Sequence, residues 1–65
     1  MTKDLIADIV LMYIGEFKDS TINGSILVVK FQDKETMFLD LNQMQYLYET
    51  DQLEKEIYDK INGNK

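Results

Sequence analysis

The segment from residue 25 to residue 41, SILVVKFQDKETMFLDL, constrains the fold of this chain most strongly. Two apolar runs flank the polar stretch at residues 32–35, which predicts two antiparallel strands, residues 25–31 and 36–40, joined by a turn. Side chains alternate between the faces of a strand, so a hairpin with one exposed face shows one polar row. Here neither row is polar, and both faces of the hairpin need cover.

The strand register decides which residues share a face. If Phe31 faces Thr36, one face carries Ile26, Val28, Met37, Leu39 and Leu41, and the other carries Leu27, Val29, Phe31 and Phe38. A slip by one residue instead groups Leu27, Val29, Phe31, Met37, Leu39 and Leu41 on one face, and Ile26, Val28 and Phe38 on the other. The second face could be covered by helices on both sides of the sheet, by a second copy of the chain, or by a foreign protein.

Residues 3–14 have the pattern of a helix that Thr2 or Asp4 caps and that ends at Gly15. Its apolar side chains cover an arc of roughly 200°, wider than the stripe of an ordinary surface helix. We therefore expect this helix to be covered on more than one side.

Asn23-Gly24 is a strong hairpin signal, because a type I′ turn needs two residues that tolerate positive φ. It predicts a strand at residues 16–22 that pairs with residues 25–31. The polar character of the first strand predicts that it lies at the sheet edge.

The last third of the chain is helical by pattern. Asp40 with Gln43, and Asp51 with Glu54, each resemble a capping box. The apolar stripe changes phase between residues 41–48 and residues 53–61, and a straight helix cannot aim both parts at one core. We predict a break at residues 49–52 between helices at 42–48 and 52–61. The chain is then a single α+β domain over residues 1–65, with the order helix, three antiparallel strands, helix, helix.

Composition removes most kinds of chemistry. The 65 residues contain no Cys and no His, so disulfides, thiolate or imidazole metal sites and His or Cys catalysis are impossible. A domain this small is marginal without a staple or a partner. The net charge of −5 is opposite in sign to that of a nucleic-acid binder and disfavours anionic membranes. Asp8 interrupts the N-terminal apolar run, which therefore does not resemble a signal peptide, and we expect a cytoplasmic protein.

We expect no cofactor, no metal and no enzymatic activity. One alternative is a small Mg²⁺-dependent enzyme that uses Asp4 and Asp8, which share a helix face four residues apart. These carboxylates equally fit the solvated strip of an apolar helix. Ser20 and Ser25 have only lysines to recruit as a base.

Candidate partner-binding residues fall into three groups. Tyr46 lies off its local apolar stripe and is the best surface anchor, whereas Tyr13, Tyr48 and Tyr58 fit the core. The apolar candidates are Leu27, Val29, Phe31 and Phe38, and the acidic candidates are Glu49, Asp51, Glu54, Glu56 and Asp59. The acidic residues also fit a solvated helix face, with Asp51–Lys55 and Glu56–Lys60 as ion pairs.

In size, acidity, lack of Cys and element order, the chain resembles the small acidic inhibitors that phages make against host enzymes and defence systems. Some anti-CRISPR proteins of this kind are DNA mimics. The resemblance implies that the five acidic residues, Glu49 among them, would supply the mimicking charge toward a basic or nucleic-acid-binding protein. Our hypothesis is a non-enzymatic, homodimeric binding protein that occludes a larger protein. The alternative is a structural or regulatory subunit of a multi-protein complex.

Overall fold

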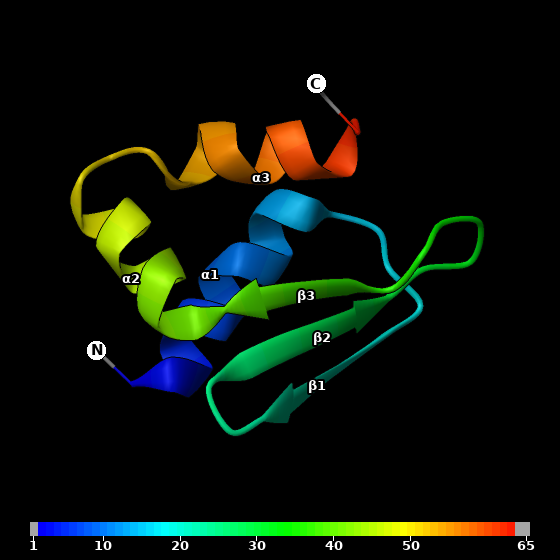
Figure 1. Cartoon of the computed structure of the whole chain (residues 1–65), viewed down its shortest axis with the longest axis horizontal. Coiled ribbons are helices and arrows are strands. Elements are labelled where there is room, and N and C mark those ends of the chain that lie inside the picture. Colours follow the sequence, from blue (N-terminus) through cyan, green and yellow to red (C-terminus); the bar gives the residue numbers. More distant parts are fainter. Residues whose placement is uncertain (1, 64–65) are drawn as a thin grey trace.

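A computed structural model describes residues 2–63 of the chain. The elements are α1 (Lys3–Ile14), β1 (Asp19–Asn23), β2 (Ile26–Lys30), β3 (Met37–Asp40), α2 (Leu41–Glu49) and α3 (Leu53–Ile61). The strands form one antiparallel sheet in the order β1-β2-β3, so polar β1 is an edge strand as predicted. The predicted α+β class and element order are confirmed (Figure 1).

Helix α1 has the predicted bounds, and its two ends show why. The Oγ1 atom of Thr2 accepts a hydrogen bond of 3.2 Å from the Leu5 N–H, which satisfies one of the unpaired donors of the first turn. At the other end, Gly15 has φ 86° and donates its N–H to the Leu11 carbonyl at 3.0 Å. A residue with a side chain rarely adopts that backbone conformation.

The first hairpin turn differs from the predicted one by a residue. Asn23 pairs with Ile26, so the two-residue loop is Gly24-Ser25 rather than Asn23-Gly24. Gly24 has φ 65°, and neither neighbour has positive φ. Positive φ at the first loop position alone is the requirement of a type II′ turn, not of type I′. The strand also begins later than predicted, at Asp19 rather than at residue 16.

Strand β3 runs directly into α2. The Oδ1 atom of Asp40 accepts hydrogen bonds from the Asn42 N–H at 2.9 Å and the Gln43 N–H at 3.5 Å, so the predicted cap is confirmed. The predicted break follows at residues 50–52. There the Gln52 N–H donates to the Leu47 carbonyl at 2.8 Å and the Asp51 N–H to the Tyr48 carbonyl at 3.2 Å.

These two bonds are the pattern of a Schellman motif, in which the residue after the C-cap takes the left-handed conformation. Asp51 holds that place with φ 65°. The prediction that Asp51 caps the last helix is therefore wrong. The residue before α3 is Gln52, whose side chain makes no capping bond.

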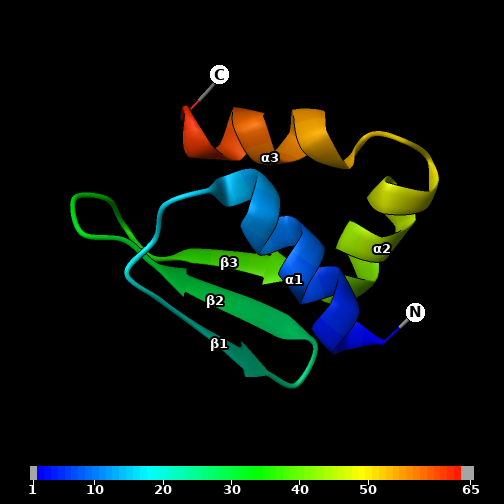
Figure 2. The same cartoon turned by 180° about the vertical axis from the view of Figure 1, so that it is seen from behind.

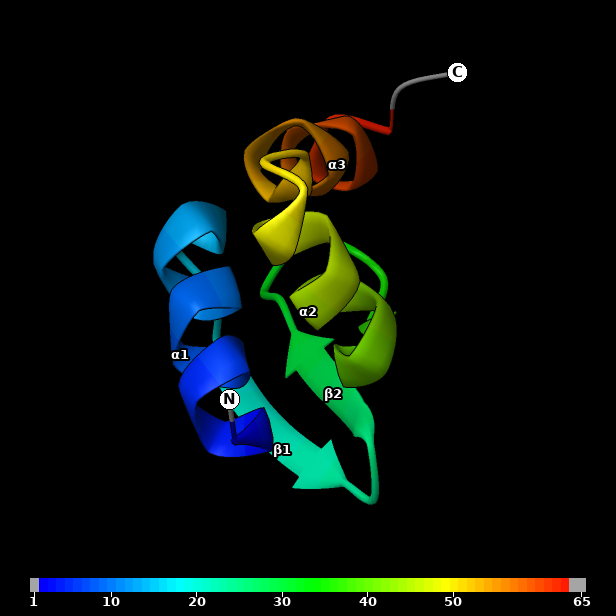
Figure 3. The same ribbon diagram turned by 90° about the vertical axis from the view of Figure 1, so that its left-hand side faces the viewer.

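Helix α1 alone lies on a face of the sheet, whereas α2 and α3 lie beyond the end and the edge of β3 (Figure 3). In Figure 1, α1 lies behind the strands; in Figure 2, turned by 180°, it lies in front of them. Helix α2 continues from the end of β3, and α3 packs on α1 and α2 (Figure 3). The core consists of Ile6, Ala7, Val10, Ile14, Leu27, Val29, Leu39, Leu41, Met44, Leu47, Leu53 and Ile57. Within residues 2–63, no helix covers the opposite face of the sheet.

The register between β2 and β3 is the second of the two considered. Leu27 pairs with Leu39 and Val28 with Phe38, so Phe31 does not face Thr36. Leu27, Val29 and Leu39 therefore point toward the helices, and Phe38 points away from them. One slip decides which of two neighbouring apolar residues is buried: Leu39 is 1% exposed and Phe38 66%.

Helix α1 is covered less completely than its wide apolar arc predicts. Its buried residues are Ile6, Ala7, Val10 and Ile14. Leu5 and Met12, at one margin of the arc, are 47% and 76% exposed. The sheet and the other two helices lie against the opposite part of the helix, so this margin remains in water.

Candidate functional site

The uncovered side of the sheet is the candidate site, and we call it the open sheet face. Cross-strand partners in an antiparallel sheet share a face, and side chains alternate along each strand. The pairing therefore assigns to this face Asp19, Thr21, Asn23, Ile26, Val28, Lys30, Phe38 and Asp40.

Phe38 lies on the edge strand β3 and is the most exposed apolar residue of the open sheet face. Thr21, Val28 and Phe38 form one cross-strand row, because Val28 pairs with both of the others. Ile26 lies two residues along β2 on the same side and is partly buried, like Val28. An aromatic side chain that keeps two thirds of its surface in water beside two β-branched residues is an apolar patch rather than an isolated exposed residue.

Polar groups border this patch at both ends of the strands. Asp19 and Lys30 pair at one end, and Asn23 and Asp40 flank Ile26 at the other. An apolar centre with a polar rim is the usual composition of a protein-binding surface. The two ends differ in charge. Lys30, the one base among the described residues assigned to this face, balances Asp19 at its end, whereas Asp40 at the other end has no base beside it on this face.

Two of the four apolar candidates are unavailable to a partner. Leu27 and Val29 are 1% and 0% exposed because their side chains pack beneath the helices, so the prediction that they contact a partner is wrong. Phe31 is partly buried at the edge of the core, and the Lys34 Nζ lies 5.6 Å from its ring centroid. Only Phe38 of this group belongs to the open sheet face.

Two of the four tyrosines are more exposed than the sequence predicts, whereas Tyr13 packs against the core as predicted. Tyr46 is 61% exposed, which agrees with its prediction as a surface residue. Tyr48 and Tyr58 are 40% and 49% exposed, so their prediction as core residues is wrong. In both short C-terminal helices only a narrow stripe is buried: Leu41, Met44 and Leu47 in α2, and Leu53 and Ile57 in α3.

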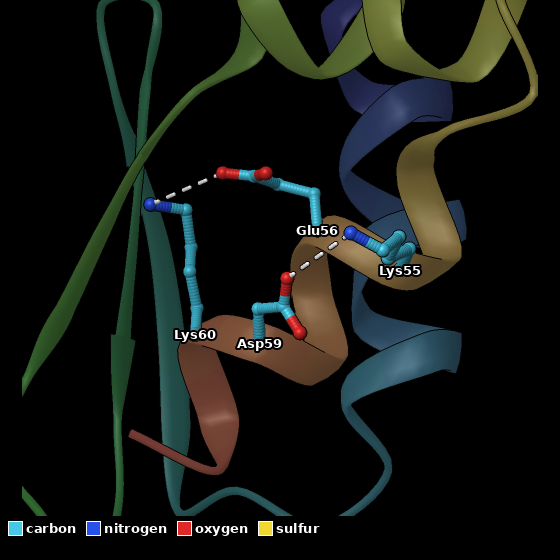
Figure 4. A network of polar contacts seen from close by, with 4 residues as sticks. All are labelled: Lys55, Glu56, Asp59 and Lys60. Atoms are coloured by element: carbon cyan, nitrogen blue, oxygen red, sulfur yellow. Dashed lines mark ion pairs between the residues drawn. The ribbon is translucent and has the colours of Figure 1, made fainter. Parts of the chain in front are cut away.

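The acidic candidates do not form an uninterrupted negative row. Lys60 Nζ lies 3.6 Å from Glu56 Oε2, and Lys55 Nζ lies 3.9 Å from Asp59 Oδ2 (Figure 4). Glu54 is exposed on the same helix, and Glu49 Oε2 accepts a hydrogen bond of 3.1 Å from Gln45 Nε2 on α2. The Glu56–Lys60 pair is as predicted, whereas Lys55 turns to Asp59 because Asp51 lies outside the helix.

Within residues 2–63, no group of three or more acidic residues is arranged to hold a metal ion. Asp4 and Asp8 lie instead beside a groove between α1 and β1. No helix among the described residues is both long and apolar enough to cross a membrane.

Several residues of the open sheet face did not stand out in the sequence as binding candidates. Ile26 and Val28 share a face with Phe38 only in the second register, and Lys30 and Asp40 resemble ordinary strand ends. Their grouping depends on a pairing that sequence pattern left open. The sequence signal that could have indicated this surface is a hairpin whose two faces are both apolar.

Comparisons with protein-family models, with curated proteins and with solved structures find no match for this chain.

Proposed function

We propose that this chain is a non-enzymatic protein-binding module that uses the open sheet face, and that it acts as an inhibitor by occluding a larger protein. The observation that carries the proposal is Phe38, which is 66% exposed beside Val28 on a sheet face that no described helix covers. Aromatic residues surrounded by apolar contacts and a polar rim supply much of the free energy of protein association.

The open sheet face is too small to hold any partner, including a second copy of the chain, in a stable complex by itself. Three strands about 4.8 Å apart, with about 3.3 Å per residue, present on the order of 200 Å². Specific complexes bury about 800 Å² on each partner. A stable complex must therefore extend beyond the strands, for instance onto the exposed side of α2 where Tyr46 lies 61% exposed.

Charge mimicry of DNA is the weaker version of this proposal. Lys55 and Lys60 each approach a carboxylate, so the two signs alternate along α3. Such a surface attracts a basic channel less strongly than an unbroken row of carboxylates does. Inhibition through the apolar centre of the open sheet face does not depend on this charge.

The test compares two exposed apolar residues on different surfaces. Phe38→Asp changes the open sheet face, and Met12→Asp makes the same chemical change on α1, where Met12 is 76% exposed. Tagged wild-type and variant chains are recovered from host cells, and co-purifying proteins are quantified by mass spectrometry. We expect a protein that is lost with Phe38→Asp and retained with Met12→Asp. If no protein shows this difference, the open sheet face is not a binding surface.

Light scattering on the purified chain tests the homodimer separately. If a second copy binds only through the open sheet face, the dimer should be weak and concentration-dependent, and Phe38→Asp should abolish it. A dimer that survives Phe38→Asp uses another surface.

A further inference from the structure

The outer edge of β1 is a second feature suited to a partner. Strand β1 pairs with β2 on one side only, and no other described strand lies beyond it. Edge strands expose unpaired N–H and C=O groups, and proteins often protect them with lysine, proline or a covering element. β1 has the sequence DSTIN, which contains neither lysine nor proline.

The hydrogen-bond pattern identifies which backbone groups face outward. The Leu41 N–H donates to the Ser25 carbonyl at 2.8 Å, so odd-numbered residues of β2 bond toward β3 and even-numbered residues toward β1. Thr21 and Asn23, the partners of Val28 and Ile26, therefore bond inward. Ser20 and Ile22 direct their N–H and C=O groups to the open edge.

These two outward residues are not equally free. The Ser20 N–H already donates to Asp19 Oδ1 at 2.8 Å. No such side-chain bond occupies the Ile22 N–H among the described residues. An incoming strand can thus exchange a complete pair of backbone hydrogen bonds with Ile22.

A groove of about 450 Å³ runs beside this edge, between β1 and α1. Its apolar lining includes Ala7, Leu11, Ile22 and Leu27, and its α1 side carries the carboxylates of Asp4 and Asp8. Neither carboxylate takes part in the ion pairs of residues 2–63. The side chain of Ile22 points to this side of the sheet, because its partner Leu27 is in the core.

We propose that β1 accepts an extended peptide segment of a partner protein as a fourth, added strand, with lysine or arginine at alternate positions. A residue opposite Ile22 would direct its side chain into the groove. The aliphatic stem of a lysine or arginine suits the apolar lining, and its charged head reaches Asp4 and Asp8. The intervening residues extend the open sheet face beside Thr21 and should be apolar. The proposal rests on the protein-binding function and specifies one kind of partner segment.

The test is a titration of the ¹⁵N-labelled chain with a capped heptapeptide of alternating lysine and valine, followed by NMR. We expect the Ile22 amide proton to move downfield and exchange more slowly, with shifts at Ala7 and Leu11. A peptide of alternating glutamate and valine should bind at least tenfold more weakly. Equal affinity of the two peptides, or no change at the Ile22 amide up to millimolar peptide, overturns the proposal.

Two matched pairs assign the effect to charge and to strand pairing. Asp4→Asn with Asp8→Asn should weaken binding of the lysine peptide about tenfold, since two exposed ion pairs are lost. Asp33→Asn with Glu35→Gln, which removes the same charge from the 31–36 connection, should leave binding unchanged. N-methylation of the lysine residues removes the donors that face Ile22 and should abolish binding, whereas N-methylation of the valines should preserve most of it. The opposite ranking in either pair contradicts the proposal.

The same titration on Phe38→Asp separates this inference from the proposed function. Phe38 lies on β3, two strands away from the free edge of β1. Peptide binding should persist in this variant. Failure of the peptide to bind would overturn the inference about β1 but not the proposed function of the open sheet face. Absence of a Phe38-dependent partner would overturn the proposed function but not the binding of the peptide to β1.

Discussion

Truncation of two neighbouring residues in β3 should have very different effects on stability. Leu39 is 1% exposed and packs in the core, whereas Phe38 is 66% exposed on the open sheet face. We predict that Leu39→Ala lowers the free energy of unfolding by about 2–5 kcal/mol, the usual cost of removing a buried leucine side chain.

The smaller effect follows from the area that Phe38 buries. A fully buried phenylalanine removes about 200 Å² from water. With two thirds of its surface exposed, Phe38 buries only about 70 Å², which at about 25 cal/mol per Å² is less than 2 kcal/mol. Because alanine retains part of that contact, we expect Phe38→Ala to cost about 1 kcal/mol.

Urea unfolding followed by circular dichroism measures both effects. A chain of this size is stable by about 3–10 kcal/mol, so Leu39→Ala should lose much of its stability or unfold without denaturant. If Phe38→Ala costs as much as Leu39→Ala or more, the register is the alternative one, in which Phe38 joins Leu27 and Val29. The assignment of the open sheet face would then be wrong.

Substitutions at three further positions test the local structure. Asp51→Gly should raise the free energy of unfolding by about 1 kcal/mol and the melting temperature by about 4–8 °C, because Asp51 has φ 65° and glycine adopts that conformation without strain. Asp51→Ala should not stabilise the chain. Equal effects of the two substitutions would contradict the Schellman assignment. Asp40→Ala removes the cap of α2 and should lower the free energy of unfolding in urea by about 1 kcal/mol, with a matching loss of helical circular dichroism signal. An unchanged free energy of unfolding would show that the cap does not stabilise the chain. Lys60→Gln should lower the free energy of unfolding by less than about 0.5 kcal/mol at low salt and not at all at 1 M salt, because the ion pair of Lys60 with Glu56 is exposed. A decrease above about 1 kcal/mol in thermal unfolding would contradict the exposed position of this pair.

The elements and their order could be predicted because local signals agreed with the tertiary fold. Thr2 and Gly15 bracket α1, and Asp40 caps α2 as expected. The break between α2 and α3 followed from a change of phase in the apolar stripe, which a straight helix cannot accommodate. These features depend on residues within a turn or two of one another.

The faces of the sheet could not be predicted in the same way. Residues on both faces of β2 and β3 are apolar, so pattern alone does not distinguish registers that differ by one residue. The packing of Leu27 and Leu39 beneath α1 decides between them, and that contact joins distant parts of the chain. The position of the first turn was missed for a local reason, because Gly24 alone supplies the positive φ that the loop needs.

The exposed tyrosines were missed because α2 and α3 are short and each buries only one narrow stripe. Tyr48 and Tyr58 lie next to that stripe in sequence pattern but remain 40% and 49% exposed. A 65-residue chain has too little material to cover both sides of such helices. The same shortage leaves the open sheet face without a helix among the residues that the structure describes.

Photo-crosslinking from position 38 tests most directly whether the open sheet face contacts another protein. Phe38 is replaced by p-benzoylphenylalanine, a larger phenylalanine analogue that its exposed position can accept, and the tagged chain is irradiated in the cells that express it. The same analogue at Met12, on α1, is the control. We predict a discrete covalent adduct with one protein from position 38 and none from position 12. Adducts of equal yield from both positions, or no adduct from position 38, would contradict the proposed binding surface.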